Sequence, residues 1–281
     1  MVNCYILCEP NGSEITSTSE TVMNIQIDNI FLHCAPEGTE FDSTVYDGIL
    51  TRLTKLLHPN YVQADPTASW KGRTTQSATM YVPDEYVGTL FHHTYEIAIN
   101  NFYPSLMISQ GDNIYSHPIA SILKTLLEYR AELKARLSSR NFLTDSYLIL
   151  VSKKFINFTY GMFSNPTSKL AGTVPHKSIG DITTENANAC IEKLKAELKS
   201  NNFSVLYADT DTLYVEDRVC DLPSEVRETQ LSKVVSRCLE QYRTMSHKVT
   251  PYDYVMVLGK KNVLTINGAL TYMHLKGTRY V

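Results

Sequence analysis

Apolar and polar residues alternate along Phe203–Val215 in a way that predicts a β-hairpin. Two short apolar runs, Val205–Tyr207 and Leu213–Val215, would form its strands. Between them lie Asp209 and Asp211, separated by one threonine. Strands rich in Val, Leu and Tyr favour a half-buried sheet surface, so the bend would be held rigidly and its carboxylates could bind a divalent cation. Aspartates are also common in ordinary turns, so the hairpin alone leaves both interpretations open.

Further strand and helix patterns are visible in the first 90 residues. The segments Cys4–Leu7 and Val22–Ile27 alternate and predict strands. Asp42 is positioned to cap a helix that ends before Pro59, and the apolar residues of that helix form one stripe: Ile49, Leu50, Leu53, Leu56 and Leu57. The polar stretch 63–83 indicates an irregular connection. None of these segments carries recognisable chemistry.

The middle of the chain predicts one strand and two helices. The strand begins near Tyr95 and is expected to break at Tyr103, because a residue before proline avoids the helical region. Leucines at helical spacing predict a helix over residues 117–140. A second helix is expected over residues 144–163, with its cap at residues 144–146.

Charged and polar residues on these two helices suggest an anion site. Arg130 and Lys134 lie one turn apart, where like charges repel by roughly 0.2–0.5 kcal/mol unless an anion lies between them. One face of the second helix carries Lys153, Asn157, Tyr160 and Gly161. Lysine can pair with phosphate, and glycine leaves room for a ligand. A solvated charged face would look the same, so this pattern is also ambiguous by itself.

Composition restricts the class of protein without naming a function. With 281 residues, 43% hydrophobic and 20% charged, the chain is typical of a globular protein. It has no apolar run of membrane-spanning length, and Met1–Cys4 does not begin a signal peptide, so we expect an intracellular protein that is not secreted. The six cysteines have no C-x-x-C spacing. A net charge of −3 means that a nucleic-acid partner would need a local cationic groove.

Three stretches, in this order along the chain, resemble motifs of family B DNA polymerases. Asn101–Ser105 (NFYPS) is similar to the SLYPS motif. Lys153–Gly161 (KKFINFTYG) resembles KxxxNSxYG with a phenylalanine in place of the serine, and Tyr207–Thr212 (YADTDT) resembles YGDTDS. Near the end of the chain, the segments 260–261 and 276–279 resemble the KKRY and KG elements. The resemblance covers about residues 80–281, and the order of the motifs makes it specific.

The resemblance implies an α+β fold, with a polymerase palm made of an antiparallel sheet backed by helices. The palm would comprise residues 91–111 and 164–281. A two-helix fingers insertion would occupy residues 112–163, and residues 1–90 would form an N-terminal α+β segment.

The resemblance also implies two-metal nucleotidyl transfer from a deoxynucleoside triphosphate to a primer 3′-hydroxyl. Asp211 would bind two Mg²⁺ ions, for which Mn²⁺ could substitute, and Asp209 would assist. Tyr103 would stack beneath the sugar and exclude a ribose 2′-hydroxyl. The other implied nucleotide-binding residues are Arg130, Lys134 and Lys153 at the triphosphate, Asn157 in the pocket, and Tyr160 and Gly161 at the nascent base pair. The implied contacts to primer–template DNA are Lys260, Lys261, Lys276, Gly277 and Arg279.

One metal-binding position departs from the family pattern. The family's other catalytic aspartate lies five residues before the tyrosine of SLYPS, where this chain has Ala98. Alanine has no side-chain ligand. Glu96 lies on the same strand face and is a further candidate metal ligand, but it is two residues away, about 6–7 Å along a strand. It could take the place of the aspartate only if the strand slid by two residues.

Three functions therefore stay open. The first is a polymerase catalytic module, impaired or dependent on a second chain that supplies a thumb or an exonuclease. The second is a catalytically inactive polymerase-like replication scaffold or nucleic-acid-binding subunit, which Ala98 favours. The third is an unrelated α+β protein with an acidic hairpin, which three motifs in a fixed order make improbable. A compact polymerase would suit a virus or mobile element, in the cytoplasm or nucleus of a host cell.

Overall fold

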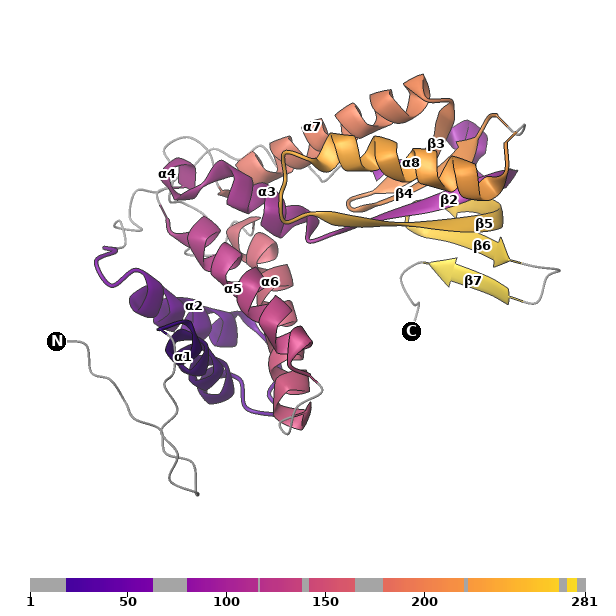
Figure 1. Ribbon diagram of the computed structural model, residues 1–281. Coiled ribbons are helices and arrows are strands. Elements are labelled where there is room, and N and C mark those ends of the chain that lie inside the picture. The colour runs from indigo at the N-terminus through magenta and orange to yellow at the C-terminus, as the bar shows by residue number, and fades with distance from the viewer. Residues whose placement is uncertain are drawn as a thin grey trace. The chain divides into compact units, whose positions relative to one another are not determined.

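The computed structural model describes residues 19–62, 80–115, 117–137, 142–164, 179–219, 222–267 and 272–276. The chain has the predicted α+β composition and divides into two compact units, whose elements are labelled in Figure 1. The first unit comprises residues 1–63 and 121–158, and the second comprises residues 64–120 and 159–281.

The described part of the first unit is helical. It contains α1 (Ser19–Cys34) and α2 (Ser43–Leu57), together with most of α5 (Ile119–Ala135) and α6 (Phe142–Ser164). Aromatic rings from all four helices form its core: Phe31 stacks on Tyr129, and Tyr46 stacks on Phe155 at a centroid distance of 4.6 Å. The α2 prediction is confirmed, with Asp42 Oδ1 accepting a hydrogen bond from the Val45 amide at 2.9 Å.

Two local predictions in the first unit are wrong. The segment Val22–Ile27 is helical and lies within α1, because Ile27 and Phe31, four residues apart, are both fully buried on one helix face. The helix α6 begins at Phe142 rather than at the predicted cap, and Asp145 instead forms an ion pair with Arg136 at 3.2 Å. The predicted strand Cys4–Leu7 lies outside the described residues.

The second unit is built on a seven-stranded antiparallel sheet with the order β1-β3-β4-β2-β5-β6-β7. The strands are β1 (Met80–Tyr81), β2 (Leu90–Asn100), β3 (Phe203–Asp209), β4 (Thr212–Asp217), β5 (Ser246–Gly259), β6 (Asn262–Asn267) and β7 (Tyr272–Lys276). The predicted hairpin is confirmed as β3 and β4. The stretch predicted to be irregular is extended at its end, where β1 pairs with β3.

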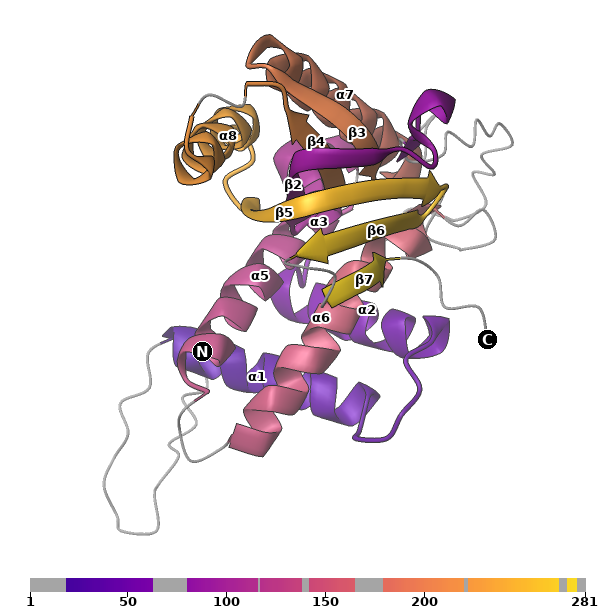
Figure 2. The same cartoon turned by 90° about the vertical axis from the view of Figure 1, so that its right-hand side faces the viewer.

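Helices cover one face of this sheet. They are α3 (Phe102–Gln110), α7 (Ile179–Ser200) and α8 (Ser224–Leu239); two short helical segments, Asp84–Tyr86 and α4 (Asp112–Tyr115), complete the unit. Figures 1 and 2 show α7 and α8 lying along the same side of the strands. The core between the sheet and these helices includes Ile97, Ile99, Leu213, Val215, Leu194, Leu198, Leu231 and Val235. The sheet backed by helices is therefore confirmed.

The end of β2 differs from the prediction. The chain turns at Asn101, whose φ of 55° is left-handed, and α3 begins at Phe102. Tyr103 is therefore helical, although it precedes a proline. A proline costs little stability at this position, because Pro104 lies in the first helical turn, where backbone N–H groups have no partner within the helix. As a result, Tyr103 is held on a helix whose buried residues pack into the sheet core.

A buried ion pair joins β4 to α8. The guanidinium of Arg227 contacts both carboxylate oxygens of Asp217, at 2.7 and 2.5 Å, and lies over the ring of Phe203. Both charged side chains are almost fully buried. The bidentate geometry fixes the far end of the β3–β4 hairpin against a helix, so the acidic bend is carried on a rigid support.

Candidate functional site

The acidic bend joins β3 to β4 through Thr210 and Asp211. Thr210 has a φ of 59°, which is unusual for a β-branched residue and is found mainly where the surroundings hold the backbone in place. Asp209 is half-buried and accepts a hydrogen bond from the Thr210 hydroxyl at 3.2 Å. Asp211 is exposed, and its carboxylate accepts a hydrogen bond from the Thr212 hydroxyl at 3.3 Å.

The bend lies beside the end of β2. The Ile99 amide donates to the Asp211 carbonyl at 2.8 Å, and Ala98 stands opposite Thr212. Glu96 stands opposite Tyr214, two cross-strand pairs further from the bend and on the same face as Ala98. The residue nearest the bend on that face is therefore Ala98, and the two-residue slip is not seen.

Two charged residues, Glu96 and Lys248, lie near Ala98 on the sheet. Glu96 accepts a hydrogen bond from the Tyr252 hydroxyl at 3.0 Å. Burial, together with this carboxylate, raises the pKa of Tyr252 to about 12. On the other side, β5 places Lys248 opposite Ala98. Lys248 was not identified from the sequence, and only the strand register reveals it.

Two predicted nucleotide-binding tyrosines form a close stack in the second unit. The rings of Tyr103 and Tyr160 are parallel within 4°, with centroids 3.8 Å apart. Burial raises the pKa of Tyr103 above its ordinary value, and Tyr160 and Asp211 raise it further. A side-chain hydrogen bond between Tyr103 and Thr210 places the stack beside the acidic bend. Sequence motifs around positions 103, 160 and 211 are thus brought together within one unit.

Thr184 is a member of this cluster that sequence reasoning missed. The Tyr160 hydroxyl lies 2.6 Å from the Thr184 hydroxyl. Thr184 belongs to α7, which was not predicted, and a single threonine within a helix gives no signal in the sequence.

The lysine pair that resembles the KKRY element forms the β5–β6 turn. Lys260 and Lys261 connect the two strands, and Lys261 has a left-handed φ of 66°. The Lys261 backbone makes a hydrogen bond to Tyr207, whose hydroxyl lies 3.5 Å from Asp209. Burial, together with Asp209, raises the pKa of Tyr207 to about 12. Tyr207 therefore links the basic turn to the acidic hairpin.

The remaining predicted DNA contacts lie at the end of the chain. Lys276 is in β7, where its backbone pairs with Val263. Gly277 and Arg279 lie outside the described residues.

The predicted triphosphate-binding cations gather on α5 and α6 in the first unit. Arg130 is half-buried, and its Nε donates to the Ile149 carbonyl at 3.3 Å. Arg130 lowers the pKa of Lys134, as do burial and the charge of Lys153. Such mutual repulsion shows that the three cations share one region of positive potential. Asn157 is exposed one turn after Lys153 on α6.

The oxygen donors at the bend suit Mg²⁺ only in part. Among the described residues, no group of three or more His, Cys, Asp or Glu side chains is arranged to hold a metal ion. Asp209 and Asp211 offer two carboxylates, and Ala98 offers none. Because Mg²⁺ is commonly bound by one or two carboxylates together with water and substrate phosphates, this donor set fits a metal that arrives with a nucleotide.

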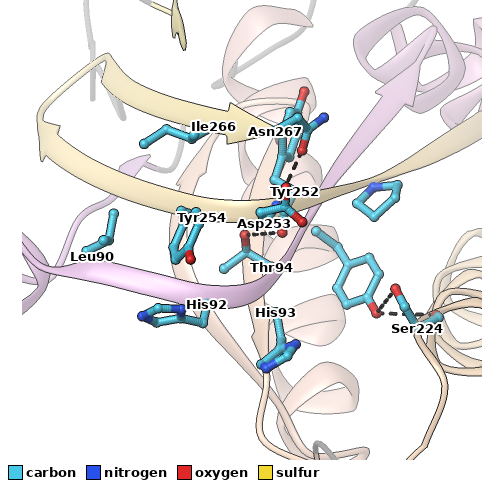
Figure 3. A pocket seen from close by; sticks show the side chains of 12 residues that line it. Leu90, His92, His93, Thr94, Ser224, Tyr252, Asp253, Tyr254, Ile266 and Asn267 are labelled. Atoms are coloured by element: carbon cyan, nitrogen blue, oxygen red, sulfur yellow. Dashed lines mark hydrogen bonds between the residues drawn. The ribbon is translucent and has the colours of Figure 1, made fainter. Parts of the chain in front are cut away.

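A separate groove of about 1230 Å³ lies at the other end of β2. Figure 3 shows His92, His93, Thr94, Tyr252, Asp253 and Tyr254 around it. The His92 and Tyr254 rings meet edge to face, with centroids 4.6 Å apart. None of the predicted site residues lines this groove.

Comparison of the sequence with models of known protein families and with curated proteins finds no match. Among the described helices, none has the length and apolar character needed to cross a membrane.

Two helical glycines allow a test of whether space in the site is required by the fold. A Cβ at Gly161 would meet nothing within 4 Å, whereas a Cβ at Gly180 would lie 2.5 Å from the Ser164 Cα. We expect Gly161→Ala to raise the free energy of unfolding by about 0.5–1 kcal/mol, because alanine favours a helix. Gly180→Ala should lower it, because backbone must shift. Urea unfolding of both variants measures the difference, and a destabilised Gly161→Ala would show that the space is not open.

Proposed function

We propose that this chain is a family B-like DNA-directed DNA polymerase module of the palm and fingers type. The observation that carries the proposal is the close approach of Tyr103, Tyr160 and the Asp211 bend in the second unit. These residues come from three motifs that are distant in sequence. In an unrelated α+β protein, the same three segments would not be expected to lie close together.

The chain's residues would divide the work of nucleotidyl transfer. Arg130, Lys134 and Lys153 would neutralise the triphosphate, where negative charge grows on the leaving group. Asp211, assisted by Asp209, would hold divalent cations that stabilise the attacking and leaving oxygens. In the second unit, Tyr103 would lie beneath the sugar, and Tyr160 and Gly161 would face the nascent base pair. In the first unit, Asn157 would contact the nucleotide.

Duplex DNA would be contacted locally rather than through overall charge. The exposed Lys260 and Lys261 turn is connected to the acidic hairpin through Tyr207, which supports a role beside the primer terminus. Lys276, Gly277 and Arg279 would extend this contact. A net charge of −3 indicates weak general affinity for DNA, so a partner that adds contacts to the duplex would strengthen binding.

The phenylalanine that replaces the family's serine has a packing role. The ring of Phe158 meets Phe41 edge to face at a centroid distance of 5.7 Å and lies 5.8 Å from Tyr46. Phe158 is itself 37% exposed, so the substitution adds an aromatic contact at the edge of the first unit's core. The phenylalanine at position 158 therefore changes local packing, while Lys153 and Asn157 on the same helix are exposed.

A replication scaffold without catalytic activity is the second candidate. The observation that favours it is the neighbourhood of Ala98, which lacks a carboxylate and faces the cross-strand Lys248. A lysine there would weaken the attraction of the bend for cations. The two functions are separable because only one requires chemistry at Asp211.

Primer extension distinguishes the two functions. We expect the wild type to extend a primed template with Mg²⁺ or Mn²⁺, and Asp211→Asn to lose at least about a hundredfold in rate, because a neutral side chain binds the cation poorly. Ala98→Asp should raise the rate by adding a carboxylate. Ala98→Asn is its control, since it has nearly the same shape without the charge.

The outcomes of that assay are exclusive. Extension only by Ala98→Asp would mean an inactive site that retains its other parts. Failure of every variant to extend, with DNA binding intact, would favour the scaffold and overturn the catalytic proposal.

Nucleotide binding tests the cationic cluster without requiring catalysis. Lys153→Ala should weaken the binding of a deoxynucleoside triphosphate about tenfold, because one charge-assisted contact to phosphate is lost. Lys154→Ala is the matched control, since Lys154 is the adjacent exposed lysine on the same helix. Calorimetry with Mg²⁺ and the nucleotide gives both dissociation constants. Equal weakening by both variants would indicate non-specific attraction and contradict the assigned role.

A further inference from the structure

We propose that Thr184 is a positioning residue that holds Tyr160 against Tyr103 and thereby sets sugar selectivity at the nucleotide site. The inference rests on the proposed function and adds to it a residue outside the motifs that suggested it. Thr184 lies on α7, is almost fully buried, and reaches Tyr160 through its hydroxyl.

The geometry of the tyrosine pair requires an external restraint. Aromatic rings usually pair in offset or edge-to-face arrangements with centroids about 4.5–7 Å apart, because a face-to-face sandwich opposes like-charged ring faces. Tyr103 and Tyr160 instead lie parallel within 4° at 3.8 Å. Ring attraction alone would not select this arrangement. Contacts at the hydroxyl ends must therefore contribute to holding the two rings in register.

The hydrogen bonds of Thr184 fix the direction of the contact. Its hydroxyl donates to the Gly180 carbonyl at 2.8 Å. A threonine hydroxyl has one proton, so the 2.6 Å contact with Tyr160 must have Tyr160 as the donor. Thr184 is thus a fixed acceptor that orients the Tyr160 hydroxyl.

The same chain of contacts extends through Tyr103. Tyr103 makes side-chain hydrogen bonds to Tyr160 and to Thr210. Side-chain contacts therefore connect Thr210 at the acidic bend, the two stacked tyrosines and Thr184 on α7.

The end of this chain is anchored by close helix packing. Gly180 approaches the backbone of Ser164 so closely that a Cβ would lie 2.5 Å from its Cα. Thr184 is one turn further along α7. Its hydroxyl is therefore presented from a backbone that cannot shift easily, and the position of Tyr160 is set by the fold rather than by a mobile side chain.

Loss of the Thr184 hydroxyl would affect selectivity more than basal rate. Tyr160 would be free to slide toward an offset stack, and Tyr103 would no longer be held in place beneath the sugar. A ribose 2′-hydroxyl would then be accommodated more easily. One net hydrogen bond is worth about 0.5–1.5 kcal/mol, which corresponds to roughly two- to tenfold in discrimination.

Three threonine variants test this inference. Thr184→Val removes the hydroxyl while keeping the shape, and Thr184→Ser retains the hydroxyl. Thr183→Val is the matched control, because Thr183 is equally buried on the same helix and donates to the Ile179 carbonyl at 2.7 Å. Single-nucleotide incorporation of a deoxynucleotide and the matching ribonucleotide gives the ratio of kcat/KM values for each protein.

We expect Thr184→Val to lower this ratio two- to tenfold, while Thr184→Ser and Thr183→Val keep the wild-type ratio. An unchanged ratio in Thr184→Val, or an equal fall in Thr183→Val, would overturn the inference.

Near-ultraviolet circular dichroism of the tyrosines supplies a readout that does not need catalysis. If the wild type does not extend primers, the proposed enzymatic function fails, and the dichroism still tests whether Thr184 positions the ring pair. Thr184→Val should change the tyrosine signal in the same direction as Tyr160→Phe, and Thr183→Val should leave it unchanged. A wild-type spectrum for Thr184→Val would overturn the positioning role itself.

Discussion

The antiparallel pairing of β2 with β4 is the constraint on which the candidate site depends. The hydrogen bond from the Ile99 amide to the Asp211 carbonyl ties the acidic bend to the end of β2. The chain then turns at Asn101 into α3, which carries Tyr103. Because side chains alternate across a strand, this register decides which residue of β2 accompanies the bend. This register places Ala98 beside the bend. A slip by one residue would turn every buried residue of β2 out of the core.

The charged residues of the proposed chemistry lie in both units: the carboxylates are on a β-hairpin, and the cations are on helices. The carboxylates Asp209 and Asp211 lie on a hairpin held by the sheet and by the buried Arg227–Asp217 pair. The cations lie on α5 and α6, where Lys134 is subject to repulsion from Arg130 and Lys153. In the first unit, a bound phosphate group would relieve that repulsion. In the second unit, a metal at the bend would need further oxygen ligands from water or substrate, because only two carboxylates are present.

Local patterns in the sequence predicted much of the fold. Alternation and a turn identified the β3–β4 hairpin, and capping by Asp42 identified α2. The short alternating segment within α1 was misread, because burial of Ile27 and Phe31 against other helices outweighs strand propensity. Tyr103, Tyr160 and Asp211 were chosen from motifs, and their roles stay predictions. Thr184 and Lys248 could not be found, because only tertiary packing and strand register bring them to the site.

The central claim is that the acidic bend of the second unit binds a metal-bound nucleotide beside the Tyr103–Tyr160 pair. Paramagnetic broadening of amide resonances by a Mn²⁺–deoxynucleoside triphosphate complex tests it directly. We expect selective broadening near Asp211, Tyr103 and Tyr160, and less of it in Asp211→Asn. No broadening in this region, or broadening centred on the groove around His92 and His93, would contradict the claim.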